Sequence, residues 1–183
     1  MGRKYAIRNQ DEFYFVTFTV VDWIDVFIRA EYRNIFIDSV KYCQREKGLL
    51  EGAWCIMTSH IHLVLGTTGT HKLEDIIRDL KSYTSRHLRK FLENSPYESR
   101  QAWMLPLMKQ AGQAKSNNKD FQFWQQHNHP IELDSLAITQ QRVDYIHNNP
   151  VVEGFVDEPA DWVFSSARDY EDRPGIIDLY FLW

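Results

Sequence analysis

The stretch LLEGAWCIMTSHIHLVLG, residues 49–66, decides the expected fold. Two apolar runs, 49–57 and 60–66, flank the short connection Thr-Ser, a pattern typical of two antiparallel strands joined by a tight turn. Side chains two positions apart on a strand share a face, so we expect His60 and His62 to project side by side. The hairpin therefore carries a pair of imidazoles on one face of a sheet.

The stretches on either side of this hairpin complete a recognisable order of elements. Residues 13–21 are rich in Val, Phe and Thr and predict a buried strand. Apolar residues at steps of three and four predict helices over 31–48, which ends on a glycine, and over 72–93. FQFWQQ, residues 121–126, is the candidate for a fourth strand. The order predicts an α+β fold, a ferredoxin-like β-α-β-β-α-β antiparallel sheet with helices on one face.

Two further segments lie after the second predicted helix. Residues 94–120 lose periodicity and predict a long loop with at most one short helical piece. Residues 134–149 predict another helix, which opens on an Asp-Ser cap and which we expect Pro150 to close. We expect residues 1–183 to form a single domain, with a core over about 13–150 and a C-terminal extension over 151–183.

Composition sets the protein class. The 44% hydrophobic and 14% aromatic content describes an ordinary globular protein, and no apolar run approaches the roughly 20 residues that a membrane-spanning helix needs. The N-terminus has charge but no following apolar region, so no secretory signal is evident. The only two cysteines, Cys43 and Cys55, argue against a disulfide framework. We therefore expect a cytoplasmic protein with no membrane partner.

The net charge of −4 is unevenly distributed. Residues 132–183 hold eleven acidic residues and three arginines, a balance of −8, so residues 1–131 carry +4. Within 72–90 six basic residues stand against three acidic ones. Since phosphate binding responds to the local field, this helix is a candidate nucleic-acid contact, although a solvated helix face would have the same composition.

The histidine pair offers a specific chemistry. Two imidazoles side by side on a strand can chelate one divalent cation, but His-x-His pairs are common and many are merely hydrogen-bonded. His127 and His129 have the same spacing, next to Asn and Pro residues that indicate a strand end or loop. Cys55 could add a thiolate ligand, although a small apolar role in its strand is the commoner one.

A second informative stretch is RVDYIHNNPVVEGFV, residues 142–156. On a helix, residues four apart share a face, so Tyr145 and Asn149 are expected to point the same way, with His147 and Asn148 turned aside. They could present a nucleophile and a metal or phosphate contact to one substrate. The spacing alone is a weak signal, because the chain has nine tyrosines and most tyrosines pack in amphipathic positions.

Taken together, WCIMTSHIHLVL and the downstream VDYIHNNPVVEGFV resemble the single-strand DNA tyrosine transposases of the His-hydrophobic-His class. The resemblance is to the REP-associated tyrosine transposases and their insertion-sequence relatives in particular. It extends from about Tyr14 to about Phe164 and includes DLKSYTSRHLRKF and WVFSS in the expected order. Family members usually carry Pro-Asn or Pro-Glu before the first histidine; here Thr58 and Ser59 stand there, and both histidines are kept.

The resemblance implies a complete site. It implies His60 and His62 as ligands of Mg2+ or Mn2+, Tyr145 as the nucleophile on an added C-terminal helix, and Asn149 as the third ligand, a position that is Gln or Asn in relatives. It implies single-stranded or hairpin DNA as the partner. It also raises the prospect of a homodimer, because some relatives exchange the tyrosine helix between subunits.

The implied reaction is physically coherent. Free tyrosine has a pKa near 10 and is only about 0.1% ionised at pH 7, so it is a poor nucleophile unaided. A divalent cation can polarise the scissile phosphate and fix it in line with the phenol. Attack would give a 5′-phosphotyrosine link and release a 3′-hydroxyl. One phosphodiester replaces another, so a 3′-hydroxyl can reverse the step and join DNA without ATP.

DNA contacts are expected from the basic helix. The candidates for phosphate contacts are Arg78, Lys81, Arg86, Arg89 and Lys90. Trp124 or Trp103 would stack an unpaired base, although tryptophans more commonly pack in a core.

Two alternatives stay open. An inactive or domesticated relative would bind hairpin DNA without cutting it, which the intact His60, His62, Tyr145 and Asn149 argue against. An unrelated metal-dependent hydrolase, or a Cys-His enzyme using Cys55, would need a base oriented toward a sulfur that we expect inside a strand.

Overall fold

The computed structural model of the protein describes residues 6–114 and 120–183. Its sheet has the order β2-β3-β1-β4, and every neighbouring pair of strands is antiparallel. The strands are β1 (Tyr14–Thr19), β2 (Leu49–Ile56), β3 (His60–Thr67) and the short β4 (Ile131–Glu132). The predicted hairpin is confirmed as β2 and β3, and β3 lies inside the sheet between β2 and β1.

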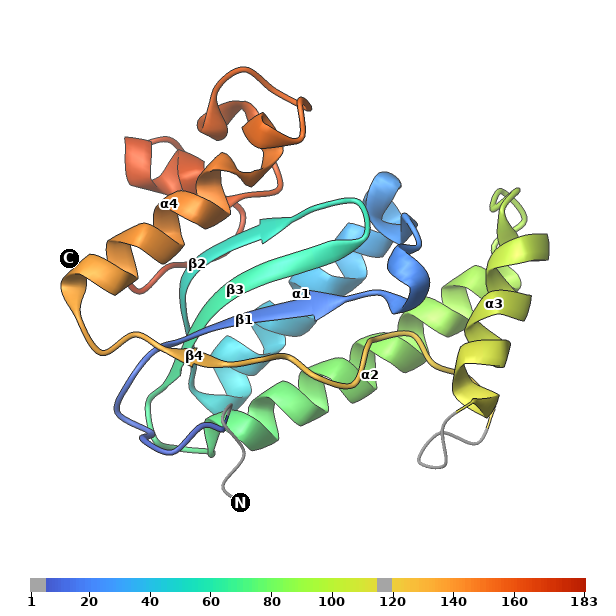
Figure 1. Ribbon diagram of the computed structural model, residues 1–183, viewed down its shortest axis with the longest axis horizontal. Coiled ribbons are helices and arrows are strands. Elements are labelled where there is room, and N and C mark those ends of the chain that lie inside the picture. The colour runs from blue at the N-terminus through green and yellow to red at the C-terminus, as the bar shows by residue number, and fades with distance from the viewer. Residues whose placement is uncertain (1–5, 115–119) are drawn as a thin grey trace.

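Helices cover both faces of this sheet. α1 (Ala30–Lys47) and α2 (Leu73–Asn94) cover one face, and α4 (Leu136–Val152) lies across the other (Figure 1). Strand alternation explains the two layers. Val16 and Phe18 of β1 belong to the larger core with α1 and α2, whereas Phe15 packs with residues of α4. The ferredoxin-like sheet with an added helix is therefore confirmed.

The fourth strand was predicted at the wrong place. Residues 121–126 contribute only one isolated bridge, at Trp124, and β4 forms later in the same segment. The Lys81 ammonium donates a hydrogen bond to the Gln125 carbonyl at 2.7 Å, and Pro130 has no backbone N–H to donate. This stretch therefore pairs with β1 only irregularly: Gln125 N–H donates to the Thr19 carbonyl at 2.8 Å and Thr17 N–H donates to the Asn128 carbonyl at 3.3 Å.

The segment expected as a loop over 94–120 contains a 13-residue helix, α3 (Gln101–Gln113). Met104 and Met108, four residues apart, are fully buried against the main core and hold the helix in place. Residues 115–119 of the expected loop lie outside the described part of the chain.

The C-terminal segment returns to the sheet. Ser165 bridges to Cys55 of β2, the Trp162 indole donates to the Ile56 carbonyl at 3.0 Å, and Tyr180 N–H donates to the Glu51 carbonyl at 2.8 Å. These contacts hold the segment against the outer strand beside α4. Among the helices of residues 6–114 and 120–183, none has both the length and the apolar content to cross a membrane.

Candidate functional site

The paired histidines project from an internal strand. His60 and His62 leave β3 on the face that α4 covers, and their ring centroids lie 4.7 Å apart. β3 is hydrogen-bonded on both sides, so the backbone that carries the two rings is held rigidly. The predicted side-by-side placement is confirmed.

His62 is oriented and kept neutral by its surroundings. Its Nδ1 atom lies 2.9 Å from the hydroxyl oxygen of Thr17 on β1. Burial, assisted by the neighbouring His60, lowers the pKa of His62 to about 3. At neutral pH the ring therefore carries one N–H. When Nδ1 donates that hydrogen to Thr17, Nε2 keeps a free lone pair, the form that binds a metal.

His60 lies in a more open and more acidic environment. Burial lowers its pKa, and the side chain of Asn149 with the carboxylates of Glu153 and Asp25 opposes part of that shift. Its Nδ1 lies 3.3 Å from the hydroxyl oxygen of Ser59. The turn residue that departs from the family pattern thus supports the first histidine.

α4 carries the tyrosine to the histidines. Ser135 caps the helix by accepting from Ile138 N–H, and Val143 and Ile146 bury their side chains against the sheet. Each of these two burials contributes about 2 kcal/mol to holding the helix there. The helix therefore sits on the sheet through one apolar stripe, and the neighbouring positions reach the histidines.

The end of α4 differs from the prediction. Pro150 does not close the helix, which continues to Val152. Gly154, two residues after the last helical residue, terminates the helix: its φ of 75° is in the left-handed region, and Phe155 N–H donates to the Pro150 carbonyl. Pro150 has no N–H to donate to the carbonyl four residues earlier, and the helix nevertheless continues for two residues beyond it. Asn149 therefore lies within the helix, one turn after Tyr145.

Tyr145 and Asn149 both reach the histidine pair of their own chain. The Tyr145 ring lies 5.1 Å from the His62 ring and 6.0 Å from Phe15, centroid to centroid, and its side chain is half exposed. Asn149 is buried next to His60. The structure thus brings together His60, His62, Tyr145 and Asn149, which the motif resemblance implied as ligands and nucleophile.

Two unpaired polar atoms test whether these residues suit a metal. His62 Nε2 and Asn149 Oδ1 are both buried and have no hydrogen-bond partner among the described residues. Leaving such atoms unsatisfied costs about 1–3 kcal/mol each. The described residues contain no cluster of three or more His, Cys, Asp and Glu side chains, so the donor set is two imidazoles and one amide oxygen. This set fits a divalent cation with further positions open to phosphate or water.

The basic helix is less available to DNA than its composition indicates. Arg78 is paired with Asp75 and Asp79, and Arg89 with Glu93. Two other cations of the predicted set, Arg86 and Lys90, are exposed on α2 and form no ion pair with the described residues.

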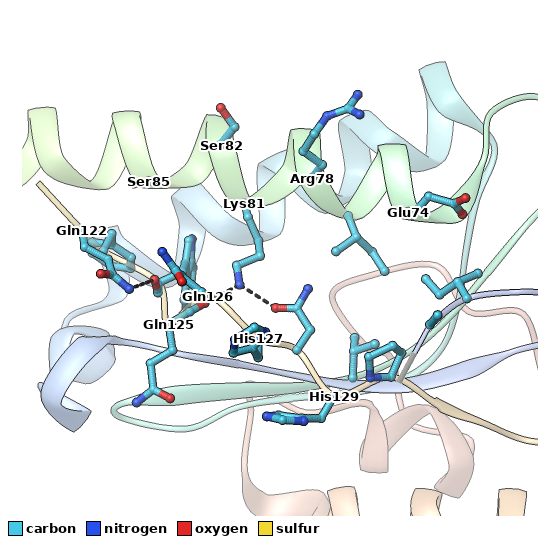
Figure 2. Close-up of a pocket in the computed structure, with 18 of the residues that line it drawn as sticks. Glu74, Arg78, Lys81, Ser82, Ser85, Gln122, Gln125, Gln126, His127 and His129 are labelled. Atoms are coloured by element: carbon cyan, nitrogen blue, oxygen red, sulfur yellow. Dashed lines mark hydrogen bonds between the residues drawn. The ribbon is translucent and has the colours of Figure 1, made fainter. Parts of the chain in front are cut away.

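Lys81 has a structural role that its charge alone did not indicate. Figure 2 shows its side chain reaching from α2 across a groove to the 121–130 segment, where it donates to the Gln125 carbonyl and the Asn128 side chain. The groove has a volume of about 980 Å³ and also borders Arg78 and Arg86. Burial lowers the pKa of Lys81 to about 8. Lys81 therefore lines this groove with its ammonium already bound to two oxygen acceptors, and it is not free for phosphate.

Trp124 was predicted wrongly as a candidate stacking residue. It is 5% exposed, lies in the main core and donates its indole N–H to Thr84 Oγ1 at 3.0 Å. Trp103, the other candidate, is 47% exposed on α3.

Sequence reasoning missed two residues beside the histidines. Thr17 becomes visible only when the register places it opposite His62. Trp23 is exposed with its ring 5.4 Å from that of His60, and its φ of 55° has no signature in a sequence without glycine there.

The alternative thiol chemistry has no support. Cys55 is fully buried in β2, and burial raises the pKa of its thiol far above the ordinary value.

His127 and His129, the competing pair, lie in the irregular segment beside the groove with ring centroids 5.9 Å apart.

Comparisons with known proteins support the fold. Residues 19–105 match the family model described as "Transposase IS200 like". Among solved structures, the chain is similar to the REP-associated tyrosine transposase bound to a REP hairpin, with a TM-score of 0.66 and 15% identity over 100% of this chain and 94% of that one. A transposase candidate from Deinococcus radiodurans R1 aligns with a TM-score of 0.45 and 20% identity over 81% of this chain and 95% of that one. No curated protein matches the sequence.

Proposed function

We propose, on the premise that the chain belongs to the IS200-like transposase family, that it is a metal-dependent single-strand DNA transposase that cuts and rejoins DNA through a phosphotyrosine at Tyr145. The matched residues 19–105 include both histidines but end before the tyrosine. The role of Tyr145 therefore depends on its position, and the 5.1 Å between its ring and that of His62 is the observation that carries the proposal.

The metal would be held by three side chains. His60 and His62 would bind Mg2+ or Mn2+ through ring nitrogens and Asn149 through its amide oxygen, which would satisfy the two unpaired buried atoms. When bound, the cation would polarise the scissile phosphate and stabilise negative charge on its oxygens.

The remaining steps belong to the chain itself. Tyr145 is half exposed and its ring lies beside that of His62, so its hydroxyl would reach a phosphate bound at the histidines. The phenol loses its proton and its oxygen forms a bond to phosphorus, while the bond from phosphorus to the 3′-oxygen breaks and that oxygen takes up a proton, so no net proton is gained or lost. Thr17 positions His62 by holding its Nδ1. A 3′-hydroxyl that attacks the phosphotyrosine reverses the step and frees Tyr145.

Single-stranded or hairpin DNA is the proposed substrate. A neighbour in structure is described as bound to a REP hairpin, and the same kind of DNA is proposed for this chain. Arg86 and Lys90 are the best candidates for phosphate contacts, because the acidic partners of Arg78 and Arg89 weaken their fields.

Adduct formation tests this proposal. The protein is incubated with labelled hairpin oligonucleotides that carry randomised single-stranded flanks, with Mg2+ or Mn2+, and resolved under denaturing conditions. We expect a covalent protein–DNA band that disappears with EDTA and in Tyr145→Phe. Tyr83→Phe is the matched control, because this tyrosine is similarly exposed but lies on α2. Binding without any adduct would mean an inactive relative that only recognises DNA.

A further inference from the structure

Four aromatic rings form a continuous row across the candidate site. The ring of Trp23 meets His60 edge-on at 5.4 Å, His60 meets His62 at 4.7 Å, and His62 meets Tyr145 at 5.1 Å. Tyr145 also contacts Phe15, near the start of β1, whereas Trp23 follows the end of that strand. Trp23 therefore lies at the His60 end of the row and Tyr145 at the His62 end.

The loop that carries Trp23 is built to present it. Asp22 and Trp23 have φ values of 52° and 55°, in the left-handed region that residues with a Cβ atom rarely adopt. Hydrogen bonds hold this conformation: Val21 N–H donates to the Phe123 carbonyl at 2.9 Å, and Trp23 N–H to the Val20 carbonyl at 3.2 Å.

The neighbours of Trp23 make its exposure unusual. Val21 and Ile24 are 4% and 5% exposed, whereas the larger and equally apolar Trp23 is 59% exposed. The left-handed backbone at Asp22 and Trp23 turns the indole outward, beside the ring of His60. Backbone strain of this kind clusters at active sites and at contacts with ligands.

We propose that Trp23 is the stacking platform for the nucleobase immediately 5′ of the scissile phosphate. This inference rests on the proposed function and adds to it a base-binding subsite. In an in-line displacement the nucleophile and the leaving oxygen lie on opposite sides of phosphorus. With Tyr145 at the His62 end, the leaving 3′-oxygen and its nucleotide face the His60 end, where Trp23 is exposed.

The charges around Trp23 favour a base over a phosphate. Asp22 and Asp25 flank the ring in sequence, and the carboxylate of Asp25 acts on His60, so a phosphate would be repelled from the loop. Bases have a π face whatever their sequence, and stacking on tryptophan needs no charge.

A polar hollow next to the loop suits the neighbouring nucleotides. It has a volume of about 520 Å³ and begins at Val21 and Asp22. Its other lining side chains are mostly amides and imidazoles that can donate and accept: Gln110, Gln122, Gln125, Gln126, His127 and His129. Such groups match the edges of unpaired bases better than the apolar side chains of a protein partner.

The platform would retain the cut end. After cleavage the nucleotide 5′ of the break carries the free 3′-hydroxyl, and it is joined to the protein by no covalent bond. Stacking on Trp23 would keep that hydroxyl next to the phosphotyrosine for the reverse reaction. Loss of the ring should therefore impair rejoining as well as cutting.

Fluorescence of an uncut oligonucleotide tests the platform separately from catalysis. The Tyr145→Phe protein, without metal, is mixed with hairpin oligonucleotides in which one 2-aminopurine is moved through the single-stranded flank. We expect quenching at one position that is lost in Tyr145→Phe/Trp23→Ala and kept in Tyr145→Phe/Trp103→Ala. Trp103 is the matched control because it is also about half exposed. Quenching that does not depend on Trp23 at any position would overturn the proposal, whether or not the protein forms adducts.

Abasic substrates then test the assigned position. With the wild-type protein, an abasic site 5′ of the mapped break should slow adduct formation by about tenfold. With an intact oligonucleotide, Trp23→Ala should slow adduct formation by a similar factor. The two losses should not multiply, and Trp23→Phe should recover most of the rate. Losses that multiply would mean that Trp23 only supports His60, and coupling to the base 3′ of the break would place the platform on the wrong side.

Discussion

The rings of Tyr145 and His62 lie 5.1 Å apart within one chain. The site needs no residue from a second subunit to bring the candidate nucleophile to the candidate ligands. We therefore predict that mixing Tyr145→Phe with His62→Ala restores no adduct formation, because neither chain alone holds both groups. Recovery of about a quarter of the wild-type adduct in the mixture, in the same hairpin assay, would show that the tyrosine helix is exchanged between subunits in solution.

Metal binding should stabilise the fold. Mn2+ at about 100 times its dissociation constant would add about 2.7 kcal/mol, which corresponds to a rise in Tm of roughly 5–10 °C for a chain of this size. His62→Ala should remove the rise, and Asn149→Ala should reduce it. His127→Ala, in the competing pair, should leave it unchanged. Differential scanning fluorimetry measures these shifts, and an equal shift in His62→Ala would show that the cation binds elsewhere.

Without the cation, Asn149→Ala should be as stable as the wild type or more stable. Within the described residues, the buried Asn149 Oδ1 atom makes no well-formed hydrogen bond, although the Asn149 side chain interacts with the His60 ring, so its removal relieves a desolvation cost of about 1–3 kcal/mol that offsets the lost packing. Unfolding in urea with EDTA present measures the difference. A loss of several kcal/mol would mean that this amide has a structural partner and is not reserved for a ligand.

Thr17 should matter through His62. Removal of a partner that orients a ligating histidine typically costs about 10–100-fold in metal affinity, so we expect that loss for Thr17→Val. Thr17→Ser keeps the hydroxyl and should keep the affinity. Isothermal titration with Mn2+ distinguishes them, and equal affinities for the two variants would exclude the orienting role.

Glu98 makes the stability depend on pH. Hydrogen bonds from Arg100, at 2.7 Å, and from Tyr32, at 2.9 Å, outweigh burial and lower the pKa of Glu98 to about 2, from an ordinary 4.5. Because the folded pKa lies below the unfolded one, this stabilisation is complete above pH 4.5 and is lost as the pH falls toward 2.

Glu98→Gln tests that contribution. We expect it to lower the free energy of unfolding by about 2–3 kcal/mol at pH 7 and by about half as much at pH 3. Glu93→Gln, which breaks a partly exposed pair with Arg89, should cost less than about 1 kcal/mol at either pH. Urea unfolding at the two pH values provides the comparison. A constant cost for Glu98→Gln would show that its charge is not what matters.

The sequence predicted those parts of the fold that depend on local periodicity. The β2-β3 hairpin, α1, α2 and the shared placement of His60 and His62 follow from alternation and from steps of three and four, which tertiary contacts did not override. The order of motifs also indicated Tyr145 and Asn149. That residues 1–183 form one domain stays a prediction.

The wrong predictions concern features that are set by contacts between residues far apart in the sequence. The stretch expected as the fourth strand pairs irregularly with β1, and Lys81, from another element, donates to one of its carbonyls. Trp124 is buried by residues of three other segments, and the ring of Trp23 is exposed by a backbone conformation that no local signal marks. Burial of a single aromatic residue is a property of the assembled core, so composition could not distinguish these two tryptophans.

The most direct measurement identifies the residue that bears DNA. The adduct formed with hairpin DNA is treated with nuclease and trypsin, and the peptides are sequenced by mass spectrometry. We predict a nucleotide phosphate on Tyr145, within the peptide that follows Arg142. A nucleotide on any other residue, or an adduct of unchanged yield in Tyr145→Phe, would contradict the account.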